Sequence, residues 1–185
     1  MTNDHTLLEK AKQLNPDGLR EFHQRFYAMV ARYVQFKVGD ARTVEDLCGE
    51  IFVRALEALR RGSAWRDSPQ GWIMGIARNV VADHYRQRER MPEVVLDEQI
   101  TSAEHMNPLQ QAIQSERNRE LVEAIQQLTD EQREVIVLRF MEGLDIQSVA
   151  HALDKTPGAI KGLQFRAMRA LAELMQSRSV EEDVV

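Results

Sequence analysis

The sequence predicts an all-α protein built from two small helical domains joined by a flexible linker. Apolar residues recur at intervals of three and four along most of the chain, which is the spacing of a helix face. Only 9 glycines and 5 prolines interrupt this spacing, and no segment alternates apolar and polar residues as a half-buried strand does. A length of 185 residues suits two modest cores better than one.

The first domain is expected to occupy residues 1–90 and to consist of four helices. A short helix near the N-terminus ends at Asn15 and Pro16, and Asp17 is a favourable N-cap for the next helix. The second, third and fourth helices are expected at about residues 17–38, 41–61 and 69–88. Each places apolar side chains on one face, so the helices can bury these faces against one another. Residues 62–68 are expected to form a loop.

A linker is expected at residues 91–109, because this segment contains Pro92 and Pro108 and shows little helical spacing. The second domain is expected to follow at residues 110–176. A short acidic tail, residues 177–185, ends the chain, and it is expected to be mobile.

Start and stop signals in the second domain predict a helix-turn-helix. Thr129 is suited to cap one helix, and Gly143 is suited to the left-handed position that ends it. A short helix is expected from about residue 145 to residue 153. Thr156 and Pro157 then start a longer helix, with threonine as N-cap and proline at the first helical position. A short helix, a tight turn and a long helix in this order are typical of the motif.

The last helix has an apolar side and a side that carries basic and amide groups. The apolar residues include Ile160, Leu163, Ala167 and Leu171, and the polar residues include Lys161, Gln164, Arg166 and Arg169. Such a helix can pack by its apolar side and offer hydrogen-bond donors to base edges in the DNA major groove. The alternative is a helical hairpin whose charges are only solvated, because the motif also occurs in proteins that bind no DNA.

Composition argues against several classes of protein. No apolar run approaches the roughly 20 residues that cross a bilayer, and the N-terminus lacks the basic and apolar regions of a signal peptide. We therefore expect a cytoplasmic protein with no membrane insertion. The only cysteine, Cys48, excludes an internal disulfide and is expected to be a small buried hydrophobe. Because the sequence shows no metal-ligand cluster, phosphate-binding loop or nucleophile–base set, we expect no metal, no cofactor and no enzymatic activity.

The net charge of −5 predicts weak DNA binding by the free protein. Basic residues are nevertheless concentrated in two places. They are Arg78, Arg86, Arg88 and Arg90 on the fourth helix and its end, and Lys161, Arg166 and Arg169 on the last helix. Such patches can contact phosphates locally. This combination is typical of a subunit that gains most of its DNA affinity from a larger assembly.

The fourth predicted helix carries aromatic, polar and basic residues in a distinctive order. They are Trp72-Ile73, Ala77-Arg78-Asn79, Asp83 and a basic run from Arg86 to Arg90. This order resembles the promoter-melting helix of bacterial sigma factors, specifically those of the extracytoplasmic-function (ECF) group. Residues 43–56 resemble the helix of that family that binds core polymerase, and residues 128–167 resemble its second DNA-binding domain. The resemblance covers roughly residues 17–90 and 118–175, in the order that the family requires.

The resemblance implies three sets of contact residues. Contacts to the minus-ten promoter element are implied for Trp65, Trp72, Ile73, Arg78, Asn79, Arg86 and Arg88. Contacts to the minus-thirty-five element are implied for Thr156, Lys161, Gln164, Phe165, Arg166 and Arg169. Contacts to core polymerase are implied for Asp46, Glu50, Phe52 and Arg54. The chain departs from the family at Gly162 and Leu163, where Ser and a basic residue are frequent, and at Gly49, where Gln is common.

Two of these contact positions have an alternative interpretation, and Asp83 on the same helix as Trp72 is expected to have a structural role. Trp72 lies on an amphipathic helix and is suited to core packing as well as to holding a base. Phe165 is suited either to a thymine methyl group or to packing against the preceding helix. Asp83 is expected to pair with a nearby arginine or to fix helix packing, rather than to touch nucleic acid.

By this resemblance, the chain is expected to be an ECF-type sigma factor. Such a factor binds core RNA polymerase, recognises promoter DNA as duplex and as melted non-template strand, and initiates transcription by melting it. An anti-sigma factor is a further implied partner. The alternative is a stand-alone helix-turn-helix regulator with an N-terminal dimerisation or ligand domain, which has no need of Ala77-Arg78-Asn79 followed by a basic run. An enzyme is a third hypothesis, and no set of catalytic residues favours it.

Overall fold

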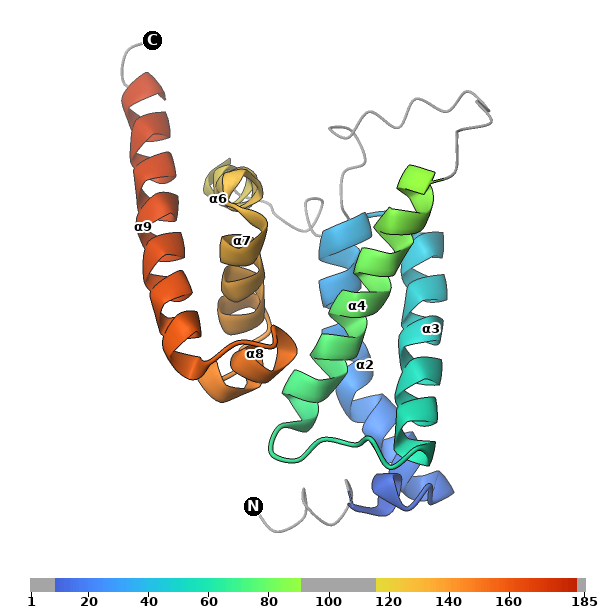
Figure 1. The fold of residues 1–185 in the computed structure, drawn as a ribbon. Helices are drawn as coiled ribbons and strands as arrows, with labels where there is room; N and C mark the ends of the chain where they lie inside the picture. The colour runs from blue at the N-terminus through green and yellow to red at the C-terminus, as the bar shows by residue number, and fades with distance from the viewer. Residues whose placement is uncertain (1–8, 91–115, 183–185) are drawn as a thin grey trace. The chain divides into compact units, whose positions relative to one another are not determined.

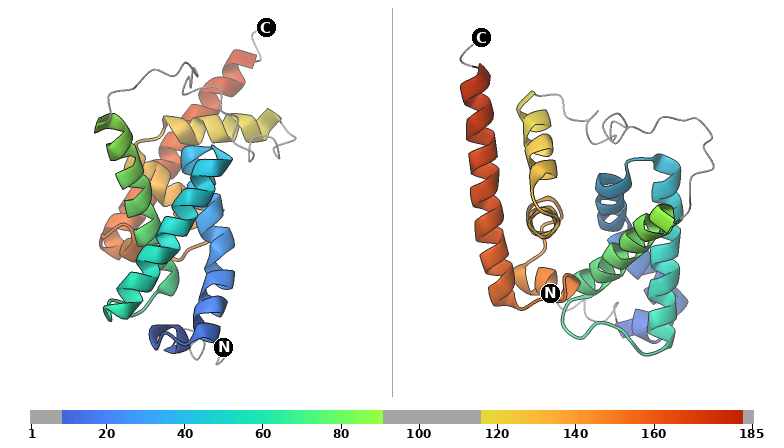
Figure 2. Two further views of the ribbon diagram at one scale, coloured as in Figure 1. Left: turned by 90° about the vertical axis from the view of Figure 1, so that its right-hand side faces the viewer. Right: turned by 45° about the horizontal axis from the view of Figure 1, so that its top comes forward.

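The computed structural model describes residues 9–90 and 116–182, and every regular element in these ranges is a helix (Figures 1 and 2). The chain divides into two compact units, residues 1–108 and 109–185. The predicted all-α fold with two helical domains is therefore confirmed. The linker predicted at 91–109 lies outside the described residues, so the predicted domain limits stay predictions.

The first domain packs three long helices against one another (Figure 1). These are α2 (Pro16–Val38), α3 (Ala41–Arg60) and α4 (Pro69–Arg90), preceded by a helical turn at residues 9–12. The three helices contribute to the buried core Phe22, Phe26, Val30, Tyr33 and Val34 from α2, Leu47, Cys48, Ile51, Ala55 and Leu59 from α3, and Ile73, Met74, Ala77, Val80 and Val81 from α4. The apolar faces expected from helical spacing therefore meet in one core.

The N-cap of helix α2 lies two residues before the predicted one. The Asn15 side chain accepts hydrogen bonds from the backbone N–H groups of Asp17 and Gly18, at 3.0 and 3.2 Å. The N-cap is thus Asn15 and not Asp17. Pro16 takes the first helical position, where the missing N–H of proline leaves no hydrogen bond unmade. Asp17 instead adds negative charge to the first turn, where the helix dipole favours it.

Cys48 is buried in α3, as expected for a small hydrophobe. Burial raises the pKa of its thiol to about 11, because the charged thiolate is disfavoured away from water. The thiol therefore stays protonated at neutral pH, and the prediction of a packing role is confirmed.

Within residues 116–182, the second domain has five helical elements (Figure 1). They are α6 (Glu116–Gln127), α7 (Asp130–Ile136), the π-helical turn η1 (Val137–Met141), α8 (Ile146–Ala152) and α9 (Pro157–Glu182). Helices α6, α7 and α8 all pack on α9. The pair α8 and α9 forms the predicted helix-turn-helix.

Local signals start α7 and α9, and end η1, where the sequence predicts. Thr129 and Gln132 form a reciprocal capping box at the start of α7. Gly143, after η1, has φ of +71°, the left-handed conformation that glycine adopts without strain. Thr156 caps α9, because its Oγ1 accepts a hydrogen bond from the Ala159 N–H at 3.2 Å.

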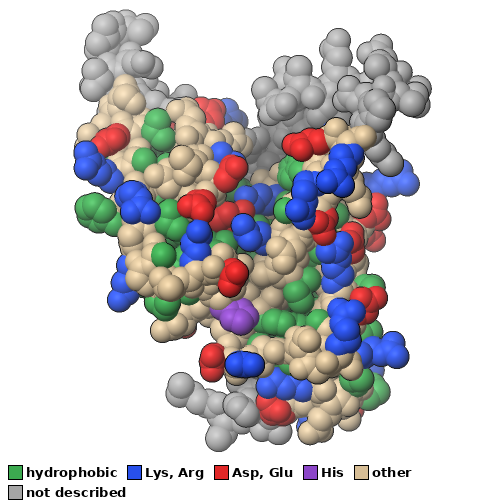
Figure 3. Space-filling view, in the orientation of Figure 1, with side chains coloured by type: hydrophobic (Ala, Val, Ile, Leu, Met, Phe, Trp, Pro, Cys, Tyr) green, Lys and Arg blue, Asp and Glu red, His purple; other side chains and the backbone are tan. Residues whose placement is uncertain are grey.

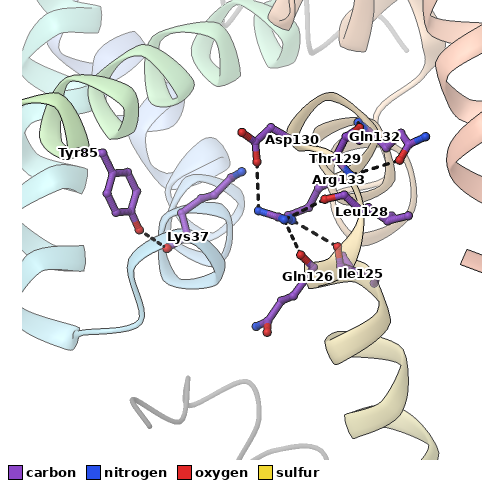
Figure 4. Close-up of polar contacts among 9 residues, drawn as sticks. All are labelled: Lys37, Tyr85, Ile125, Gln126, Leu128, Thr129, Asp130, Gln132 and Arg133. Atoms are coloured by element: carbon purple, nitrogen blue, oxygen red, sulfur yellow. Dashed lines mark hydrogen bonds and ion pairs between the residues drawn. The ribbon is translucent and has the colours of Figure 1, made fainter. Parts of the chain in front are cut away.

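Arg133 joins the end of α6 to α7 (Figure 4). Its guanidinium donates to the backbone carbonyls of Ile125, Gln126 and Leu128, at 3.3, 2.5 and 3.0 Å. The last carbonyls of a helix have no partner within the helix, so an arginine placed here satisfies them. This contact fixes the corner that leads into the helix-turn-helix.

Two features of the second domain differ from the prediction. Helix α9 continues to Glu182, whereas the sequence predicts a tail from residue 177 onward. The turn η1 widens the end of α7 into a π-helix, which no local sequence signal predicts. None of the helices in the described parts of the chain has the length and apolar character needed to span a membrane.

Candidate nucleic-acid interfaces

Helix α4 presents a row of exposed polar and basic side chains opposite its buried side. Arg78 and Asn79 are exposed, although the residues on either side of this pair, Ala77 and Val80, are buried. Arg86 and Arg90 extend the row to the end of the helix, and the exposed Arg88 lies at the same end on the face of Ala77 and Val81. Figure 3 shows Lys and Arg side chains gathered over this end of α4. The row can therefore contact a nucleic-acid strand along most of the helix.

An aromatic cluster lies beneath the start of this row. The Trp65 ring stacks on Phe22 with centroids 5.4 Å apart, and the Trp72 ring meets Trp65 edge-on at 5.3 Å. Trp65 is only 6% exposed, so it belongs to the core and forms no open pocket wall. Ile73 is fully buried at 0% and is also a core residue.

Trp72 lies at the rim of the cluster. It is half-buried, and its indole Nε1 donates to the Ser63 carbonyl at 3.1 Å. One part of the Trp72 ring therefore packs, as one of the two interpretations expects, and another part reaches the surface. Contact of Trp72 with a base stays a prediction. Ser63 belongs to the loop before α4. The last residue of this loop is Ser68, whose Oγ accepts a hydrogen bond from the Gly71 N–H at 2.9 Å.

Helix α3 presents an acidic and aromatic surface. Asp46 and Glu50 are exposed, and the half-buried Phe52 ring lies 4.5 Å from His23 and 6.1 Å from Tyr27, measured between ring centroids. The large apolar side chains Tyr27, Val53 and Leu56 are exposed nearby on α2 and α3. A mixed surface of this kind is suited to a protein partner.

Arg54, which the sequence groups with this surface, forms ion pairs within the domain. Its Nη1 donates to Asp83 on α4 at 2.7 Å, and its Nη2 donates to Glu50 at 2.5 Å. Asp83 also accepts a hydrogen bond from Arg86. These hydrogen bonds, first that from Arg54 and then that from Arg86, lower the pKa of the Asp83 carboxyl. The prediction that Asp83 pairs with an arginine is confirmed.

Helix α9 projects its polar side chains into solvent. Lys161, Arg166 and Arg169 are exposed, while Arg169 also pairs with Glu173 at 2.9 Å. Phe165 is 71% exposed, so it does not pack against the preceding helix. Exposed basic and apolar groups on a helix-turn-helix second helix are what major-groove contact requires.

Gln164 lies at the edge of this surface and contacts a residue that sequence reasoning misses. Its Oε1 accepts a hydrogen bond from Arg139 Nε at 3.2 Å, and Arg139 also donates to the Leu144 carbonyl. The helix-turn-helix is fixed further by Asp145, whose carboxylate caps α8 by accepting from the Ser148 N–H at 2.7 Å. Arg139 therefore links η1, the loop before α8 and α9.

Comparison with known families decides the class of protein. The model of sigma-70 region 2 matches residues 20–91, and the model of sigma-70 region 4 matches residues 124–173. The ECF RNA polymerase sigma factor SigX of Bacillus subtilis is 30% identical over 171 residues, covering 88% of this chain and 86% of SigX. The chain belongs to the ECF group of sigma-70 family RNA polymerase sigma factors.

Other relatives of this sigma factor are also ECF RNA polymerase sigma factors. The ECF sigma factor BldN of Streptomyces coelicolor is 34% identical over 170 residues, which cover 91% of this chain and 64% of BldN, so the chain spans under two thirds of that relative. ShbA of Streptomyces griseus is 32% identical, with 91% and 93% of the two chains covered. Sigma factors of this kind are transcription initiation factors and not classical enzymes.

Two solved structures share the fold. One is CnrH in complex with the cytosolic domain of CnrY, with a TM-score of 0.69, 22% identity and coverage of 94% of this chain and 97% of that one. The other is the sigma factor RpoE in complex with the anti-sigma factor NepR from Bartonella quintana, with a TM-score of 0.58, 22% identity and coverage of 85% and 98%. The fold of this sigma factor is thus one that these two solved structures also have.

Proposed function

We propose that this ECF sigma factor brings core RNA polymerase to selected promoters and opens them, with its first domain at the minus-ten element and its second at the minus-thirty-five element. The observation that carries the proposal is the exposed pair Arg78 and Asn79 beside the Trp72 rim, on the helix that belongs to sigma-70 region 2. Asparagine is disfavoured in the middle of a helix, so its exposed position here favours a function over a structural need.

Opening a duplex requires that unstacked bases be held outside it. Aromatic and apolar surfaces can hold a flipped base, while amide and guanidinium groups bond its edge or its phosphate. We assign Trp72, Arg78 and Asn79 to the base and Arg86 and Arg88 to the phosphates. Trp65 and Ile73 support this surface from the core and do not themselves contact DNA.

The minus-thirty-five element is assigned to the exposed side of α9. Arg166 is suited to a bidentate contact with guanine, and Phe165 to a thymine methyl group. Lys161 and Arg169 are suited to phosphates. Thr156 contributes by capping α9, so that the N-terminal end of the helix is correctly formed.

Core polymerase is assigned to the α3 surface that contains Asp46, Glu50 and Phe52. The exposed apolar side chains beside Phe52 support this assignment, because aromatic and apolar groups surrounded by charge are frequent in protein interfaces. An anti-sigma factor that covers this surface and the α9 surface is a further proposed partner. We place the protein in the cytoplasm, where polymerase and chromosome are, and we propose a non-enzymatic function without cofactor or metal.

The proposed function is tested by run-off transcription with purified core RNA polymerase on fragmented genomic DNA of the host, with and without the protein. New, discrete start sites that depend on the protein are expected, and they identify the promoter sequences directly. A folded protein that neither binds polymerase nor creates start sites contradicts the proposal.

Asn79→Ala is expected to slow open-complex formation while affinity for core polymerase is unchanged, because the amide acts only on DNA. Permanganate footprinting measures the opening, and a fluorescence titration measures the affinity. Gln87→Ala is the matched control, since Gln87 is also an exposed amide on α4. If Asn79→Ala opens the promoter as fast as wild type does, Asn79 does not belong to the proposed site.

The anti-sigma factor is tested by affinity capture of the protein from host cells under resting and stress conditions. A second protein that is bound at rest and released under stress, in exchange for polymerase, is expected. Recovery of polymerase alone under both conditions contradicts this partner.

A further inference from the structure

Arg54 physically joins the helix assigned to polymerase to the helix assigned to DNA. Its guanidinium reaches Asp83, 29 residues away in the sequence, and holds Glu50 on its own helix at the same time. A guanidinium is a planar fork that makes paired contacts with carboxylates in fixed directions. Arg54 is therefore oriented by two carboxylates of its own domain before any partner binds.

Asp83 is the centre of this network on α4. It lies one helical turn after Asn79 and one before Arg86, and its carboxylate accepts hydrogen bonds from both Arg54 and Arg86. A carboxylate at this place, if uncompensated, repels the phosphates of a bound strand. Arg54 supplies the compensating positive charge from the side of α3, so Arg86 does not have to supply all of it.

We propose that Arg54 is a positioning residue for promoter opening and not a contact for polymerase. Through Asp83, it sets the orientation of Arg86 and the charge beside Asn79, so that the helix that docks on polymerase determines how α4 meets DNA. This inference rests on the proposed function. It gives Arg54 a different role from Asp46, Glu50 and Phe52. The resemblance places all four residues in the set that contacts polymerase.

The network is accessible enough to be altered without unfolding the domain. The Arg54 and Asp83 side chains are 39% and 33% exposed, and ion pairs in such partly hydrated positions contribute little to stability. Arg54→Met and Asp83→Asn keep the approximate size of each side chain and remove its charge. Arg54→Lys keeps the charge but loses the fork, and it serves as a second variant if Arg54→Met is not folded.

The experiment compares wild type, Arg54→Met, Asp83→Asn and the double variant in complex with core polymerase. The rate of opening is measured on one promoter from the run-off experiment, as intact duplex and with its minus-ten segment made non-complementary and hence already open. Affinity for core polymerase is measured separately. Arg60→Met on α3 and Glu89→Gln on α4 are the controls, because each removes one exposed charge from the same helix.

Arg54→Met is expected to open the duplex promoter about tenfold more slowly, the scale of coupling within one charge network. Asp83→Asn also loses the orientation of Arg86, but it removes the repelling carboxylate, so it is expected to slow opening by less. The double variant is expected to be no slower than Arg54→Met, because it has no uncompensated carboxylate. Affinity for polymerase and activity on the open template are expected to stay within about twofold of wild type.

A large loss of polymerase affinity in Arg54→Met alone overturns the inference, because it makes Arg54 a polymerase contact. Additive effects of the two substitutions, equal losses on both templates, or variants that open the duplex as fast as wild type overturn it as well. If wild type itself fails to bind polymerase, the proposed function fails first, and the inference fails with it.

Discussion

In the first domain, the side chains proposed to contact DNA lie beside a buried aromatic cluster and an ion-pair network between helices, whereas in the second they project from one helix into solvent. Trp65 in that cluster is 6% exposed, whereas Phe165 on α9 is 71% exposed. The difference matches two tasks. Holding an unstacked base requires a surface that is already formed, while reading base edges in a groove requires side chains that reach outward.

The largest expected effect separates the two aromatic residues. Trp65→Ala is expected to lower the free energy of unfolding of the first domain by about 3–5 kcal/mol, the cost of removing a large buried side chain. Phe165→Ala is expected to change stability by less than about 0.5 kcal/mol, as exposed positions do. Urea unfolding monitored by circular dichroism measures both. Similar losses in the two variants contradict the comparison.

Arg166→Ala is expected to reduce binding at promoters that have a matching minus-thirty-five element, by about 1–3 kcal/mol for a lost bidentate base contact. Promoters without such an element are expected to be spared, because Arg166 makes no contact there. Transcription from a randomised minus-thirty-five library measures the change. Arg119→Ala, at an exposed position of α6, is the control. A uniform loss on all promoters moves Arg166 to a structural or phosphate-binding role.

Asp145→Ala is expected to destabilise the second domain by about 1 kcal/mol at neutral pH, because α8 loses its cap. The hydrogen bond from the Ser148 N–H holds the pKa of this carboxyl below its usual range. The stabilisation is therefore complete above the usual carboxyl pKa and is lost as pH falls through the lowered one. The difference between wild type and variant, measured by urea unfolding, should shrink in acid. Asp145→Asn keeps the cap and should show no such pH dependence.

The smallest expected effect concerns Gln164. Because Arg139 Nε can only donate, the Gln164 atom that faces it is the oxygen, and the amide NH₂ is left for DNA. Gln164→Glu keeps an acceptor for Arg139, so stability should change by less than about 0.5 kcal/mol. Its added charge should weaken promoter binding in a filter-binding assay. Unchanged binding shows instead that Gln164 serves only to hold Arg139.

Local signals predict most of the second domain. Thr129, Gly143 and Thr156 each act through neighbours within a few residues, so their sequence context is sufficient to place helix ends. Capping also explains the error at α2. Asn15 and Asp17 are both good caps, and Pro16 decides between them by occupying the first helical position.

The contacts that define the first domain are not local, which is why the sequence does not reveal them. Trp65 stands in a loop, and only its contact with Phe22 on α2 shows that it is buried. The sequence predicts that Asp83 pairs with an arginine, but only the structure shows that Arg54, on a separate helix, is such a partner. The contact residues as a set remain a prediction drawn from family resemblance, whereas the packing around them is visible only in three dimensions.

In helix α9, the residues that pack in the core are different from the residues that are exposed to solvent. Ile160 and Ala167 are fully buried, while Lys161, Phe165 and Arg166 contribute almost nothing to the core. Substitutions at the exposed positions therefore leave the scaffold intact. Over evolutionary time, a duplicated copy of this gene can acquire a new promoter preference through α9 by single codon changes. In the laboratory, the same positions are the natural ones to randomise when a second, non-cross-reacting promoter system is wanted.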